Sequence, residues 1–120
     1  IDDEGQPYAF SAFYAFDEVN FCLLLASCDE SSHVKFLKNS KLVAGTIALD
    51  TKIVGKIEGV QFQGAMSEAS ESEREIYFKR FFYAKAMDPK IWSISLEKVK
   101  FTSNTLGFGK KIKWERGDKI

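Results

Sequence analysis

The chain has 120 residues, which predicts a single domain over residues 1–120. Its 17 basic and 17 acidic side chains cancel, and no apolar run approaches the roughly 20 residues of a membrane helix, so we expect neither a nucleic acid nor a membrane as partner. Two cysteines and one histidine make neither a disulfide framework nor a recognisable zinc-ligand set, so we expect no metal and a reducing cytoplasmic location.

The first predicted elements form a β-hairpin. Side chains of Tyr8–Phe16 alternate with a period of two, which indicates a strand. Asp17–Glu18 turns the chain, and Phe21–Ala26 is apolar on both faces, as in a strand buried on both sides. We therefore expect the two runs to pair, with Leu24 in the core.

A short helix and two further β runs follow. Ser27–Ser32 offers several N-cap residues for a helix that ends near Asn39–Ser40. Leu42–Leu49 is the next β run. Ile53–Met66 is another, and its glycines are typical of the bulges and bends that barrels use. We expect Phe62, which lies in that second run, to be buried.

The longest predicted helix begins at Ser70 or Ser72, because Glu73 or Glu75 follows three residues later as a capping box. It is apolar most of the way round, so it needs cover on more than one face, and it stops at Asp88–Pro89.

Three β runs complete the chain, namely Ile91–Leu96, Lys98–Thr102 and Lys110–Glu115. The tally is about six strands with two inserted helices and no regular alternation of strand and helix. The sequence therefore predicts a mainly β fold. Within this class we expect a small antiparallel barrel, because a barrel leaves the fewest strand edges exposed.

Two segments carry a resemblance to a known family. Ser27–Leu37, followed by the apolar run Val43–Ile47, resembles the strand, phosphate turn and helix of the FMN-binding split barrels of the pyridoxamine 5'-phosphate oxidase superfamily. The closing run Lys100–Lys111 is similar to the end of the YhbP-like bacterial family within that superfamily.

This resemblance implies a six-stranded antiparallel split barrel with inserted helices, an FMN cofactor and a homodimer. It also implies a flavin-dependent oxidoreductase that acts on a small molecule whose identity the residues do not reveal. Members of the superfamily usually carry an N-terminal helix and a first strand, and we expect both to be missing before residue 8.

The resemblance assigns the residues around the flavin phosphate. Ser27 matches the Ser or Thr that closes the strand, and Ser31 matches the Ser that opens the helix. His33 stands where the family usually has Lys or Arg, and Lys35 matches a second basic position. Hydroxyl donors and positive charge at a helix start suit a phosphate. A helix-capping Ser31 and a solvated Lys35 explain the same residues without a ligand.

The flavin ring would be contacted elsewhere. In split barrels, the strand that matches Ser11, Ala12 and Phe13 commonly contributes backbone contacts to the ring. Gln61 and Gln63 share one strand face, and their amides could reach the ring carbonyls or a neighbouring subunit. A solvent-facing strand side explains the two glutamines equally well.

No nucleophile–base arrangement is visible in the sequence, so catalytic residues stay unassigned and a bound flavin would carry any redox chemistry. Two alternatives remain open: a non-enzymatic module that binds flavin or another planar ligand, and a cofactor-free structural dimer. His33 keeps both open because it is not a permanent charge. The basic stretch Lys110–Trp114 is better explained by a solvated edge strand than by nucleic-acid binding.

Overall fold

A computed structural model describes residues 1–118 of the chain. The chain divides into two compact units. The first unit contains Ile1–Val43 and Ala65–Ser95, and the second contains Ala44–Gly64 and the residues from Leu96 onward. Each unit is described below by itself.

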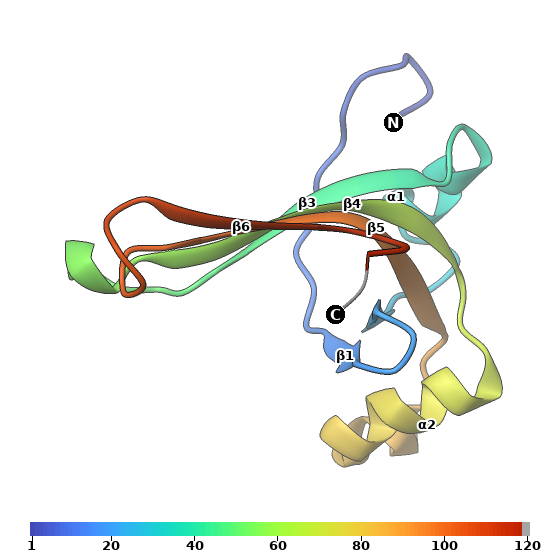
Figure 1. The fold of residues 1–120 in the computed structure, drawn as a ribbon. Coiled ribbons are helices and arrows are strands. Elements are labelled where there is room, and N and C mark those ends of the chain that lie inside the picture. Colours follow the sequence, from blue (N-terminus) through green and yellow to red (C-terminus); the bar gives the residue numbers. More distant parts are fainter. Residues whose placement is uncertain (119–120) are drawn as a thin grey trace. The chain divides into compact units, whose positions relative to one another are not determined.

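The described residues form six β-strands and two α-helices, joined in places by short 3₁₀ helices (Figure 1). In chain order these are β1 (Ala15–Asp17), β2 (Cys22–Ala26), α1 (Ser32–Lys35), η1 (Phe36–Lys38), β3 (Leu42–Ala48), η2 (Val54–Lys56), β4 (Glu58–Glu68), α2 (Glu71–Arg80), η3 (Phe82–Met87), β5 (Ile91–Ser103) and β6 (Lys110–Glu115). Within residues 1–118, no helix is long and apolar enough to cross a membrane.

The strands pair in the order β1-β2-β5-β4-β3, and β6 pairs with β5. The β1–β2, β2–β5 and β5–β6 pairs are all antiparallel. The predicted hairpin is present, because Ala15 pairs with Leu24 and Asp17 pairs with Cys22. The prediction of a mainly β fold with six strands and two inserted helices is thereby confirmed for the described residues.

The predicted strand over Tyr8–Phe16 is wrong for most of its length, since β1 begins only at Ala15. The aromatic side chains before it pack on helices instead of alternating across a sheet. The ring of Tyr8 meets Phe36 of η1 edge-on at 5.1 Å, and Phe13 lies 6.2 Å from Phe81 at the end of α2. The alternation of aromatic residues in this segment therefore did not indicate a strand, because these side chains pack against helices.

Three predicted boundaries also shift. The runs Ile91–Leu96 and Lys98–Thr102 form one continuous strand, β5, because Glu97 between them stays paired through its carbonyl oxygen to the Arg116 N–H. The longer helix ends at Arg80, where Phe81 leaves the helical conformation with φ −121° and ψ 57°. The part of the predicted β run before Glu58 is instead irregular or 3₁₀ in form.

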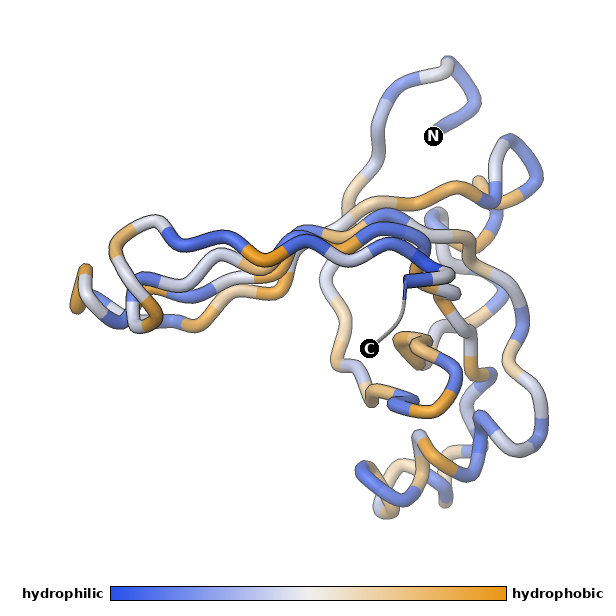
Figure 2. Tube along the Cα trace, viewed as in Figure 1, coloured by the Kyte–Doolittle hydropathy of each residue, from blue (hydrophilic) through white to orange (hydrophobic). Residues whose placement is uncertain are grey.

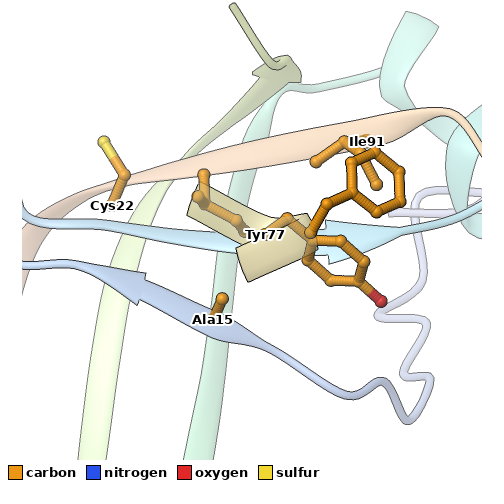
Figure 3. Close-up of a cluster of buried hydrophobic side chains, with 6 residues drawn as sticks. Ala15, Cys22, Tyr77 and Ile91 are labelled. Atoms are coloured by element: carbon orange, nitrogen blue, oxygen red, sulfur yellow. The ribbon is translucent and has the colours of Figure 1, made fainter. Parts of the chain in front are cut away.

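The hydrophobic core of the first unit lies where α2 packs against the β1–β2 hairpin and the start of β5. Figure 3 shows side chains from each of these elements gathered together. The core residues are Ala15, Cys22, Leu24, Tyr77, Phe78 and Ile91. Leu24 is fully buried, as predicted, and the run on β2 is buried from Cys22 to Leu25.

Helix α2 begins at the predicted capping box. The Ser70 hydroxyl accepts from the Glu73 backbone N–H, and the Glu73 carboxylate accepts from the Ser70 backbone N–H at 2.9 Å. The same carboxylate accepts from the Ser93 hydroxyl of β5 at 2.5 Å. Burial would raise the pKa of Glu73, but the hydrogen bonds from Ser70 and Ser93 outweigh it and hold the pKa below its usual value.

The second unit is built around a close approach between β3 and β4. A methyl group on Gly45 would lie 2.5 Å from Cζ of Phe62, so glycine lets this ring pack directly against β3 and a larger residue would displace it. Phe62 is half-buried, and the prediction that it lies fully in the core is wrong. The β6 strand is largely hydrophilic, as its colouring in Figure 2 shows.

Leu24→Ala should lower the free energy of unfolding by about 2–5 kcal/mol, because it leaves a cavity in a fully buried site. Leu42→Ala is the matched control, since Leu42 is 73% exposed and should change stability by about 0.5 kcal/mol or less. Urea unfolding measures both. Equal effects of the two substitutions would contradict the core described above.

Candidate functional site

The candidate phosphate turn starts at Ser27, which β5 holds in place just after β2. Its backbone N–H donates to the Lys90 carbonyl oxygen, and its own carbonyl oxygen accepts from the Trp92 indole N–H, both at 3.1 Å. Its hydroxyl lies 2.8 Å from Nε2 of His33. Two of the residues predicted to surround a phosphate are therefore in direct contact.

Ser31 lies in the same turn. Its hydroxyl is 3.2 Å from the Cys28 thiol, and its backbone N–H donates to the Cys28 carbonyl oxygen. Ser31 occupies the N-cap position of α1 but makes no side-chain cap bond, so its hydroxyl is not used to start the helix. Because α1 has only four residues, its dipole is small, and positive charge must come from side chains.

Positive charge near the turn is limited. Lys35 is exposed on the last turn of α1. Lys90 is already paired, with Nζ at 2.9 Å from Asp29 and 3.6 Å from Glu68. His33 can therefore supply positive charge in direct contact with the Ser27 hydroxyl when its imidazole is protonated.

The ring of Phe10 stacks on the imidazole of His33, with 3.7 Å between centroids and 7° between planes. Burial lowers the pKa of His33 below its usual value, so the imidazole is mostly neutral near pH 7. Ser11, Ala12 and Phe13 follow Phe10 directly and are exposed, but they do not form the strand that was predicted for them.

Gln61 and Gln63 lie in the second unit, on an open groove of about 620 Å³. Both are exposed on β4, as their shared strand face predicted. The groove is also lined by Gly45, Phe62 and Trp114 and by three lysines of β5 and β6, Lys98, Lys100 and Lys113.

A further polar cluster lies in the first unit. Ligand-type atoms of Asp17, Cys22 and Glu73 all lie within 4.8 Å of one another. The Asp17 carboxylate accepts from the backbone N–H groups of Val19 and Asn20 and shapes the β1–β2 turn. Since Glu73 caps α2 and binds Ser93, both carboxylates already serve the fold.

The structure brings together Ser27 and His33 of the predicted set, whereas the Ser31 hydroxyl contacts Cys28. Sequence reasoning missed two further features. The lysines of β5 could have been found, because Lys98 and Lys100 alternate on one strand face. Phe10 gave no signal, because a stacking contact across 23 positions leaves no local pattern.

Comparison with known proteins identifies the family, although no protein-family model matches the chain. The UPF0306 protein YhbP of Salmonella paratyphi A and that of Salmonella enteritidis are each 38% identical to it over 120 residues, which cover 97% of this chain and 82% of the relative. The chain belongs to the UPF0306 (YhbP) family. The resemblance inferred from the closing run Lys100–Lys111 is thereby confirmed.

Two solved structures share the fold. A heme binding protein from Mycobacterium smegmatis matches with a TM-score of 0.77 and 16% identity over 96% of this chain, which spans only 50% of that protein. A candidate 5-nitroimidazole antibiotic resistance protein from Bacteroides thetaiotaomicron matches with a TM-score of 0.66 and 18% identity, over 83% of this chain and 70% of that one. These neighbours are of the split-barrel type, so the predicted fold class is confirmed.

Phe10→Ala should raise the pKa of His33 toward its usual value near 6.5, because the stacked ring contributes to the burial that lowers it. Tyr8→Ala is the control, since the Tyr8 ring contacts Phe36. Proton NMR of the imidazole ring across pH gives the value directly, because the chain has one histidine. If Phe10→Ala left the pKa unchanged, the stacked ring would not be its cause.

Proposed function

We propose that the chain is a single split-barrel domain that binds FMN and works as an oxidoreductase on a small molecule. The observation that carries this proposal is the 2.8 Å contact between the Ser27 hydroxyl and Nε2 of His33, in the turn that also contains Ser31. Hydroxyl groups next to a group that can become a cation form a donor set suited to a phosphate. The YhbP family and the split-barrel fold support it.

In this proposal, Ser27, Ser31, His33 and Lys35 hold the phosphate. The backbone of Ser11–Phe13 and the amides of Gln61 and Gln63 would contact the ring. When bound, FMN supplies hydride and electron transfer, and the chain's own residues supply binding and orientation.

His33 links phosphate binding to pH through Ser27. A protonated imidazole can only donate hydrogen bonds, so the Ser27 hydroxyl must then accept from Nε2. Its own hydrogen is thereby released toward an incoming acceptor such as a phosphate oxygen. Protonation therefore adds both a charge and an oriented donor at the turn.

We propose FMN rather than heme as the cofactor, although one fold neighbour is a heme binding protein. The turn around Ser27 offers the hydroxyls of Ser27 and Ser31, which match phosphate oxygens and are not among the side chains that hold heme iron. The proposal also includes a homodimer in the cytoplasm. Exposed apolar side chains of the first unit, Phe13, Phe82, Tyr83 and Met87, support the dimer, since each is at least 70% exposed.

FMN affinity should rise as pH falls from about 8 toward 6.5, because a phosphate dianion favours protonated His33 and raises its pKa in the complex. Below about pH 6, protonation of the phosphate should oppose a further gain. His33→Lys should strengthen binding at the alkaline end and flatten this dependence, and Ser31→Ala should weaken binding throughout. Quenching of flavin fluorescence measures each affinity.

Riboflavin is the matched control for these titrations, because it lacks the phosphate. It should bind far more weakly and show little dependence on pH. Equal affinity for FMN and riboflavin, or no binding of either flavin, would overturn the proposed site.

A further inference from the structure

We propose that the free edge of β3 pairs in antiparallel orientation with β3 of a second copy of this chain, an inference that rests on the homodimer of the proposed function. Among the described residues, β1, β3 and β6 each pair with one strand only, so each has a free edge. The unpaired N–H and C=O groups of an edge strand can accept a strand from another chain.

Two of these edges are protected against such pairing. β1 has three residues, and β6 carries Lys110, Lys111 and Lys113. Short length and lysine side chains both hinder the addition of a further strand. β3 instead runs for seven residues, Leu42–Ala48, with no charged side chain and no proline. Its edge is therefore open to another strand.

The contacts between β3 and β4 show which backbone groups of β3 are free. The Leu49 N–H, just after β3, donates to the Glu58 carbonyl oxygen at 3.1 Å. Further back along β3, Gly45 lies against the Phe62 ring, which fits the same antiparallel register. Alternate residues of an antiparallel strand direct both backbone groups toward one neighbour, so Gly45 and Ile47 face β4. The residues whose backbone groups face the free edge are Ala44, Thr46 and Ala48.

These three outward residues leave room for a partner strand. Among residues 1–118, no backbone hydrogen bond from a segment outside the sheet reaches any of them. All three are exposed, and their side chains are small. A second strand can therefore approach their N–H and C=O groups without displacing a bulky side chain.

Charges at the two ends of β3 favour a second copy as the partner. Lys41 precedes the strand and Asp50 follows it, and both are exposed. Neither makes an ion pair within the described residues. Antiparallel pairing of two copies brings the start of one β3 beside the end of the other, so each Lys41 lies near the partner's Asp50. Parallel pairing would instead place like charges together. The edge is thus self-complementary about a twofold axis.

Amide hydrogen exchange of the chain without FMN, followed by NMR at several chain concentrations, tests this pairing. The amides of Gly45 and Ile47 should be protected at every concentration, because they donate to β4. The amides of Ala44, Thr46 and Ala48 should be protected at millimolar concentration and should exchange rapidly on dilution. Light scattering of the same samples gives the oligomeric state.

Asp50→Lys should weaken the dimer about tenfold, because it places two lysines together at each end of the paired strands. Lys41→Asp/Asp50→Lys is the matched control, since it keeps the first substitution and restores opposite charges between the copies. Its dimer should therefore be as strong as that of the wild type. Sedimentation equilibrium measures each dissociation constant, and dispersion of the amide signals reports folding of each variant.

A dimer whose Ala44, Thr46 and Ala48 amides exchange rapidly would overturn the inference and leave the homodimer standing. Protection of these amides in the monomer would also overturn it, because another segment of the chain would then cover the edge. A double variant as weak as Asp50→Lys, or no effect of Asp50→Lys, would contradict the antiparallel pairing. A chain that stays monomeric at millimolar concentration would overturn both the inference and the homodimer. Because FMN is absent throughout, none of these results bears on the phosphate turn.

Discussion

Pairing between β2 and β5 fixes the position of Ser27, and the rest of the phosphate turn follows from it. The register places Ala26 opposite Ile91, so Ser27 is the first residue beyond the paired strand. The Lys90 carbonyl and the Trp92 indole then hold its backbone on both sides. The side chain of Ser27 is left to face His33, and a buried strand thereby supplies a rigid edge for a polar site.

Burial of His33 has opposite consequences for stability and for binding. Its pKa lies below the usual value near 6.5, so the folded chain binds fewer protons than the unfolded chain around that pH. The contribution of neutral His33 to stability is present above about pH 6.5 and is lost as pH falls through the folded value. An anion that draws a proton onto His33 therefore works against the burial of this imidazole, and binding and stability are coupled at one side chain.

Local patterns predicted the parts of the structure that depend on neighbours in sequence. The Ser70–Glu73 capping box, the buried run on β2 and the final strand Lys110–Glu115 follow from capping, hydropathy and alternation. The extended segment before Ala15 was misread because its aromatic rings pack on η1 and on the end of α2.

The closing loop illustrates the same limit on local patterns. Asn104 accepts from the Gly109 N–H and donates to the Val54 carbonyl oxygen, 50 positions away. The family resemblance pointed to this run, but only the fold shows that Asn104 fastens the β5–β6 loop to η2. In the candidate site, the turn was predictable because its residues lie within nine positions, whereas the stacking of Phe10 on His33 depends on tertiary packing.

The central claim is that a flavin phosphate is held beside His33, and the pKa of this imidazole with and without FMN tests it most directly. The chain has one histidine, so its ring signals need no assignment. The account predicts a pKa below about 6.5 for the chain alone and a clearly raised pKa with saturating FMN, with riboflavin causing no rise. An imidazole that titrates at the same pH with and without saturating FMN would contradict it.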